Sequence, residues 1–196
     1  MINIAKPLTD YVIYNGRKIR LDVSFGNILR VYDVFKDDFL TDSEKAEFAL
    51  ALLVKSRKLP DIRALDVIFR EQIETYGKKS TNNLRVVDFR QDSAYIYSSF
   101  LMDYGIDLTE QCDLHWQKFI ALFQGLSEHT KMREVMSIRA RPVPKPDKYN
   151  QEYIRSLMEL KAYYALDISQ EEREKNFQAG LKNMFEALKV QAERGD

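Results

Sequence analysis

The sequence is poor in the residues that support catalysis, metal binding and covalent cross-linking. Its 196 residues include one cysteine and two histidines. A single cysteine excludes an internal disulfide framework, and two histidines leave few arrangements for a nucleophile paired with a base. The glycine-rich phosphate loops and the zinc-binding pattern HExxH are also missing from the sequence. We therefore expect a protein that is not an enzyme and that needs no cofactor.

An excess of charge of one sign and long apolar runs are missing as well. The 30 basic and 30 acidic residues give a formal net charge of +0, so no overall field attracts nucleic acid or an anionic membrane. No stretch approaches the roughly 20 apolar residues that a membrane helix needs, and the N-terminus lacks the apolar core of a secretory signal. Hydrophobic residues at 45% and charged residues at 31% are proportions typical of a soluble globular protein.

The N-terminal half begins with a hairpin pattern and continues with helical patterns. Asn15-Gly16 separates two alternating runs, 11–14 and 18–23, which predicts a tight β-hairpin. From Phe25 onward the apolar spacing is helical. Thr41 and Glu44 form the pattern of a capping box that opens a helix with Phe48, Ala49, Leu52 and Leu53 on its apolar side. A third helix is expected after Pro60, with Asp61 as its cap.

The middle of the chain predicts three further helices. The first runs from about residue 91 to 104 and ends at Gly105, which suits a left-handed C-terminal position. Asp107 and Glu110 have the spacing of a second cap, which predicts that the next helix starts there and ends near Gly125. A third helix is expected from residues 127–130 to about Ile138. The aromatic clusters of this region fit either a core or a base-stacking surface.

A proline-rich segment divides the chain. Three of the five prolines lie within residues 142–146, where alternating proline favours extended backbone. We expect a helical body with its hairpin over 1–141, a linker over 142–148, and a C-terminal helical pair over 149–196. The fold class is therefore mainly α. The last helix carries an apolar stripe that either folds back on the body or receives a helix of another copy or another protein; its members are Phe177, Leu181, Met184, Phe185 and Leu188.

Three sets of polar residues have an alternative reading as sites. Cys112 and His115 have the spacing of two metal ligands on a helix, but a full set of four is not evident, so no metal site is expected. Four aspartates, at 88, 92, 103 and 107, stand next to predicted helix ends, where capping is their expected role. Basic residues gather between Lys131 and Lys148, which indicates a solvated patch or, as a lesser alternative, a nucleic-acid contact; they are Lys131, Arg133, Arg139, Arg141, Lys145 and Lys148.

Residues 89–139 carry a resemblance to a known family. The motifs that carry it are DSxxIYSSF at 92–100, YGIDL at 104–108, LHWxxFxALFxGLSExT at 114–130 and MxxR at 136–139. This pattern resembles a family of bacteriophage proteins encoded beside the tape-measure gene of long-tailed phages and prophages of Gram-positive hosts. Members of that family are thought to act as tail-assembly chaperones, which bind the tape-measure protein while the tail tube forms.

The resemblance implies a non-catalytic binding protein. Its implied partner is the tape-measure protein, with the tail tube protein as a further candidate, and self-association is expected because several copies on one long client reinforce one another. The implied location is the host bacterial cytoplasm, with the protein absent from the mature virion. The candidate interaction residues are Tyr95, Tyr97, Trp116, Phe177, Leu181, Met184, Phe185 and Leu188. Two alternatives stay open: a structural minor tail or connector subunit, and a small nucleic-acid-binding regulator.

Overall fold

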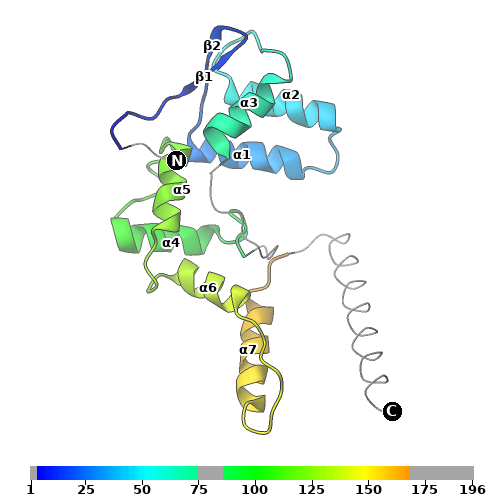
Figure 1. Ribbon diagram of the computed structural model, residues 1–196, viewed down its shortest axis with the longest axis vertical. Helices are drawn as coiled ribbons and strands as arrows, with labels where there is room; N and C mark the ends of the chain where they lie inside the picture. Colours follow the sequence, from blue (N-terminus) through cyan, green and yellow to red (C-terminus); the bar gives the residue numbers. More distant parts are fainter. Residues whose placement is uncertain (1–3, 75–85, 168–196) are drawn as a thin grey trace. The chain divides into compact units, whose positions relative to one another are not determined.

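The computed structural model describes residues 4–74 and 86–167 of the chain. The chain divides into two compact units, Met1–Arg141 and Pro142–Asp196. The described part is mainly helical, with one two-stranded antiparallel sheet (Figure 1). The mainly α fold class and the N-terminal hairpin are thus confirmed. The second helix of the predicted C-terminal pair lies outside the described residues.

The first unit holds the hairpin and most of the helices. In chain order its elements are β1 (Tyr11–Tyr14), β2 (Arg17–Arg20), α1 (Phe25–Lys36), α2 (Asp42–Leu53), α3 (Ala64–Ile68), the π-helical turn η1 (Phe69–Ile73), α4 (Ser93–Tyr104), α5 (Trp116–Gln124) and α6 (Lys131–Ala140). The second unit contains α7 (Gln151–Tyr163) among its described residues.

The hairpin forms where the Asn-Gly pair predicts it. Asn15 and Gly16 have positive φ angles of 49° and 71°, which a tight two-residue loop requires at both central positions. Tyr14 pairs with Arg17, and Tyr11 pairs with Arg20. The Gln72 side-chain amide donates to the Tyr11 carbonyl at 3.0 Å, which attaches the hairpin to η1.

Two helix ends confirm the local chemistry expected of them. The Glu44 amide donates to Thr41 Oγ1, and the Thr41 amide donates to Glu44 Oε2, so the capping box of α2 is complete. Gly105 takes the left-handed conformation at φ 63° and ends α4. Asp61, by contrast, is not the N-cap of α3, which is Arg63; its carboxylate accepts from the Arg63 amide in the turn before that helix.

Two expectations about these helices are wrong. Phe48 is 51% exposed, and the buried side of α2 is formed by Ala49, Leu50 and Leu53. The helix expected after Asp107 starts only at Trp116. Its late start has a tertiary cause, because the Phe25 amide donates to the Leu114 carbonyl and the Trp116 amide donates to the Val23 carbonyl. Residues 114–116 are therefore held extended against the entry to α1.

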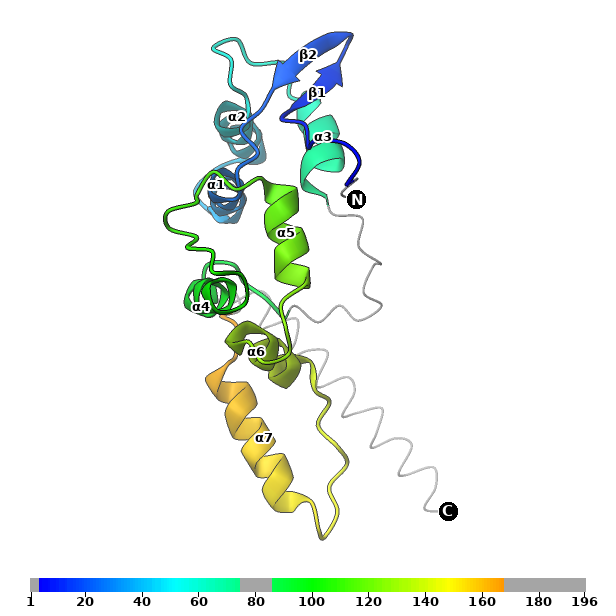
Figure 2. The same cartoon turned by 90° about the vertical axis from the view of Figure 1, so that its left-hand side faces the viewer.

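The core of the first unit is built around aromatic rings. Phe119 of α5 stacks on Phe25 of α1 at 4.8 Å and on Phe100 of α4 at 5.2 Å between ring centroids. Trp116 is 2% exposed, and its indole nitrogen donates to the Ile73 carbonyl at 3.0 Å. Figures 1 and 2 both place α5 between the hairpin with α1–α3 and the pair α4–α6. The rings of the central segment thus join the two halves of this unit.

Candidate interaction surfaces

A buried ion pair fixes α4 against α6. Arg139 Nη1 and Nη2 lie 2.6 and 2.7 Å from the two carboxylate oxygens of Asp92. The Asp92 and Arg139 side chains are 0% and 7% exposed. Arg139 also donates to the Val86 carbonyl, and Asp92 accepts from the Asp88 amide. This bidentate geometry satisfies both charges and gives α4 and α6 one defined register.

Asp92 therefore does not have the capping role expected from the sequence. Asp88 and Asp107 do support local turns, whereas Asp103 contacts Ser127, which lies 24 positions further along the chain. Asp103 accepts from the Ser127 amide at 2.7 Å, and Asp107 accepts from the Thr109 amide at 2.8 Å. Asp88 accepts from the amides of Arg90 and Gln91. Burial acts to raise the pKa of the Asp88 carboxyl. The hydrogen bonds from the Lys36 ammonium and from these amides outweigh that effect and lower the pKa to about 2.

Tyr97 of α4 is held in place by a residue of the segment that follows the helix. Its hydroxyl donates to Asp107 Oδ2 at 3.0 Å. This hydrogen bond to a carboxylate raises the pKa of Tyr97, and hydrogen bonds from Thr109 are the main cause of the lowered pKa of Asp107. The Tyr97 ring is consequently fixed at the surface of α4, half-buried.

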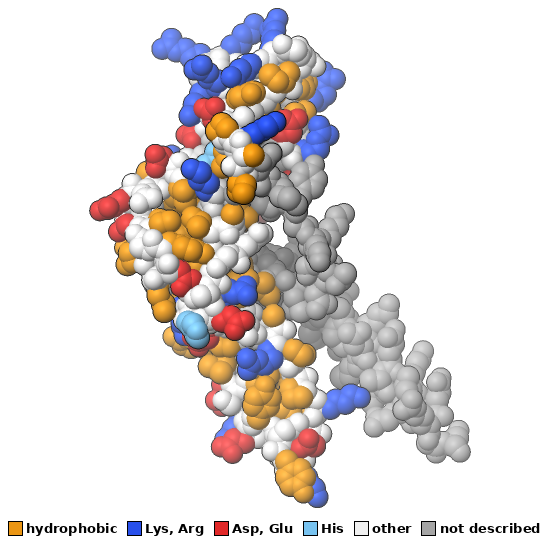
Figure 3. Space-filling model, turned by 60° about the vertical axis from the view of Figure 1, so that its left-hand side comes forward, with side chains coloured by type: hydrophobic (Ala, Val, Ile, Leu, Met, Phe, Trp, Pro, Cys, Tyr) orange, Lys and Arg blue, Asp and Glu red, His pale blue; other side chains and the backbone are white. Residues whose placement is uncertain are grey.

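The outer side of α4 carries an apolar stripe, which we call the α4 stripe. It consists of Ala94, Tyr97 and Leu101, whose spacing of three and four residues places them on one side of the helix, with Met102 beside Leu101 at the edge of that side. Leu101 is 46% exposed and Met102 is 64% exposed. Figure 3 shows hydrophobic side chains on the surface at the level where Figure 1 places α4 and α5. Its rigid backing and exposed side chains suit contact with another apolar helix.

The structure separates the predicted interaction residues. Tyr95 and Tyr97 are half-buried and pack against the core. Trp116 lies inside the core, so its indole is not presented at the surface. Phe177, Leu181, Met184, Phe185 and Leu188 lie outside the described residues. Leu101 and Met102 were not among the predicted interaction residues; the sequence places Leu101 on the apolar face of this helix, yet its side chain is 46% exposed.

His115 has a structural position at the start of α5. Its Nδ1 accepts from the Gln117 amide at 3.1 Å, and its Nε2 lies 3.4 Å from the Thr9 carbonyl. Burial is the largest cause of the lowered pKa of His115, which favours the neutral ring that this cap requires. Cys112 is an exposed free thiol. Within residues 4–74 and 86–167, no three His, Cys, Asp or Glu side chains are grouped as metal ligands.

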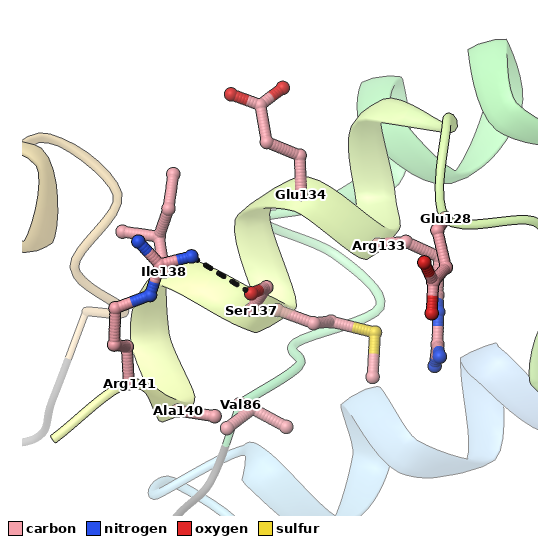
Figure 4. Close-up of a pocket in the computed structure, with 9 residues that line it drawn as sticks. Val86, Glu128, Arg133, Glu134, Ser137, Ile138, Ala140 and Arg141 are labelled. Carbon is pink, nitrogen blue, oxygen red and sulfur yellow. Dashed lines mark hydrogen bonds between the residues drawn. The ribbon is translucent and has the colours of Figure 1, made fainter.

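A pocket of about 560 Å³ lies along α6 (Figure 4). Its walls mix both charges with apolar groups, since Arg133 and Arg141 share it with Glu128, Val86 and Ile138. The guanidinium of Arg141 lies 3.5 Å from Ser137 Oγ. In Figure 4 the Glu134 carboxylate points away from Ser137. The residues drawn therefore do not converge on one point where a substrate could react.

Two of the basic residues between Lys131 and Lys148 are engaged with carboxylates inside the first unit. Arg139 is withdrawn into the pair with Asp92, and Lys131 lies 2.9 Å from Glu134. Lys145 and Lys148 belong to the second unit. Because Arg139 is buried in this pair, it is not available to bind a phosphate, which weakens the nucleic-acid alternative.

In the second unit, α7 buries Leu157 and leaves several large side chains exposed. Leu157 is 2% exposed, whereas Tyr153 and Tyr163 are 49% and 77% exposed. Tyr149, just before the helix, is 85% exposed. None of the helices in the described part of the chain is long and apolar enough to cross a membrane.

The chain belongs to the family described as Bacteriophage Gp15 protein, whose model matches residues 7–166. The match includes the hairpin, the whole α1–α6 body and α7. It confirms the bacteriophage part of the resemblance carried by residues 89–139. No curated protein and no solved structure matches the chain.

Proposed function

We propose that this protein is a tail-assembly chaperone that binds the tape-measure protein of a long-tailed bacteriophage and supports assembly of the tail tube. It acts by binding, without catalysis, in the host cytoplasm, and leaves before the virion is complete. The observation that carries the proposal is membership of a bacteriophage protein family over residues 7–166. The specific role rests on the motifs at 92–139 and on the surface that these residues form.

The α4 stripe supports a binding role for that surface. Leu101 and Met102 are exposed on a helix whose position is fixed by the Asp92–Arg139 pair and by the aromatic core. A flexible thioether such as Met adapts to different apolar partners, which suits a client with many similar helical segments. Apolar surface that a long client exposes before assembly can be covered by such a stripe.

Several copies on one client follow from the same reasoning. A single α4 stripe offers a small contact, and small contacts give modest affinity. Copies that also contact each other raise the overall affinity without tightening any single contact. Self-association is thus part of the proposal.

Co-expression with the long protein encoded by the neighbouring tape-measure gene tests this function. We expect the client to be soluble and captured with the tagged wild-type chain, and insoluble when expressed alone. The variant L101E/M102E should lose most of the captured client, because two carboxylates on the stripe would have to be desolvated. I13E is the matched control, since Ile13 is 55% exposed on the hairpin.

The structural-subunit alternative makes the opposite prediction about the mature particle. Mass spectrometry of purified virions should find no peptides of this chain if it is a chaperone. A stoichiometric amount in the particle would contradict the proposal and favour a minor tail or connector subunit.

A further inference from the structure

The first unit has a basic groove at the hairpin, which we call the hairpin groove. It has a volume of about 810 Å³ and lies between the hairpin and the segment that follows α2. Ile19, Val54, Leu59 and Pro60 supply apolar walls. The described lining residues include five cations, Arg17, Lys18, Arg20, Lys55 and Lys58. Figure 3 shows Lys and Arg side chains crowded around this part of the unit.

Few of these cations are neutralised inside the groove. Asp61 is the acidic residue among the described residues of the lining, and both its oxygens accept from the Arg63 guanidinium, at 2.8 and 3.1 Å. A groove with an apolar floor and a cationic rim fits an apolar side chain flanked by carboxylates. It fits a cationic segment poorly, because like charges would meet at the rim.

The opposite end of α2 presents a segment with this chemistry, which we call the Phe39 knob. Phe39 is 97% exposed in the turn between α1 and α2. Asp37, Asp38 and Asp42 flank it in the sequence. The Asp37 carboxylate accepts from the Phe39 amide at 2.9 Å, which fixes the turn that displays the ring. A large exposed aromatic ring on a defined turn is typical of an interface anchor.

The knob and the groove of one copy cannot meet. The knob precedes the N-terminus of α2 and the groove segment follows its C-terminus, and a helix of 12 residues is about 18 Å long. Figure 1 likewise shows the α1–α2 turn at the end of α2 away from the hairpin. The knob and the groove can therefore bind each other only between two molecules.

We propose that the Phe39 knob of one copy occupies the hairpin groove of the next copy. The contact joins two different surfaces, so it is head-to-tail, and repetition produces a filament or a closed ring. The inference deepens the self-association included in the proposed function, because it names the two surfaces. It does not depend on which client the assembly binds.

Two complementary variants test the contact. The knob variant is D38K/F39S, and the groove variant is R17E/K58E; both change exposed residues, and circular dichroism checks that both remain folded. Sedimentation velocity of the wild-type chain should show concentration-dependent assemblies larger than a dimer. Each variant alone should still be monomeric at a concentration about tenfold above that at which the wild-type chain assembles, because the anchor or its site is lost.

A mixture of the two variants gives the sharpest result. The intact knob of the groove variant fits the intact groove of the knob variant, so the 1:1 mixture should form a dimer that cannot extend. Raising the salt concentration from about 0.05 to about 0.5 M should dissociate it, because screening weakens exposed charge pairs. L101E/M102E is the control, and it should assemble like the wild type.

Three outcomes would overturn this inference. They are a wild-type chain that stays monomeric, variants that assemble like the wild type, and a mixture that stays monomeric. Retention of a single-stranded oligonucleotide by the wild type and not by R17E/K58E, without any self-assembly, would instead assign the groove to nucleic acid. Client capture is measured separately from self-assembly. Loss of assembly in D38K/F39S tests the contact between copies, and capture of the client through the α4 stripe tests the chaperone proposal.

Discussion

The guanidinium of Arg139 and the carboxylate of Asp92 are both removed from water, and their mutual hydrogen bonds offset that cost. Removing one partner leaves the other as a buried charge without compensation. The two residues are 47 positions apart in the sequence, so no local pattern indicates that they meet. The motifs of the resemblance include both positions, but they do not show that the residues form a pair.

Arg139→Gln should lower the free energy of unfolding by about 3–5 kcal/mol, the usual effect of breaking a buried pair. The double variant D92N/R139Q should lose less than the sum of the two single losses, because it removes both charges together. Urea unfolding followed by circular dichroism measures these values. Arg70→Gln is the control: its exposed pair with Asp66 has a 3.9 Å separation and should contribute within about 0.5 kcal/mol. Equal losses of unfolding free energy in Arg139→Gln and Arg70→Gln would contradict a stabilising role for the buried pair.

His115 makes stability depend on pH in a defined direction. Its pKa is lowered in the folded chain, so folding favours the neutral ring. The stabilisation is fully present above the ordinary pKa of 6.5 and is lost as the pH falls through the lower pKa of the folded state. Thermal unfolding between about pH 7 and 5 should show a steeper loss for the wild type than for His115→Asn, which caps without titrating. Identical slopes would show that His115 does not contribute.

At the scale of elements, the C-terminus of α4 gives a clean test of a backbone requirement. Gly105 has φ 63°, and a Cβ added there would have no heavy atom within 4 Å. Gly105→Ala should therefore cost about 1 kcal/mol through backbone strain alone. Gly105→Asn should cost less, because Asn tolerates the left-handed region. The midpoints of chemical unfolding of the two variants measure the difference in stability. An unchanged midpoint for Gly105→Ala would contradict the left-handed requirement at this position.

Elements set by local chemistry could be predicted from the sequence. The Asn15-Gly16 loop, the Thr41–Glu44 capping box and the stop at Gly105 each depend on residues within a few positions. The start of α5 could not be predicted, because the backbone of residues 114–116 is bound by the distant segment 23–25. The cap pattern at Asp107 forms a turn with Thr109 instead of a helix. Local chemistry was sufficient only where no tertiary contact competed.

The buried side of α2 shows a similar limit. Phe48 is the largest apolar residue in the helix, yet it is 51% exposed while Leu50 is 2% exposed. Size and hydrophobicity do not determine which side of a helix meets the body when apolar residues surround much of it. The same limit applies to the two surfaces proposed for binding. The exposure of Leu101 and Phe39 depends on tertiary packing, which the local sequence pattern does not reveal.

At the scale of the whole molecule, the division at residues 141 and 142 predicts separable roles. A chain ending at Arg141 retains the hairpin, the aromatic core and the Asp92–Arg139 pair. We expect it to unfold cooperatively, with a midpoint close to that of the same unit in the full chain. Deleting 142–196 should also weaken assembly or client binding, if the C-terminal segment supplies the predicted additional interface. Unchanged assembly and unchanged client binding would contradict that second role.

Balanced charge with local segregation is consistent with an assembling protein. The net charge is +0, but the hairpin groove gathers cations while the Phe39 knob gathers carboxylates. Such segregation favours a defined orientation between copies more than it favours raw affinity. A head-to-tail series of copies would present the α4 stripe repeatedly along a long client.

The most direct test of the central claim is co-expression of the tagged chain with the protein from the neighbouring tape-measure gene, followed by capture and measurement of complex size. We expect a soluble complex that contains the client and several copies of this chain, lost in L101E/M102E and retained in I13E. A client that stays insoluble beside a folded, soluble wild-type chain would contradict it.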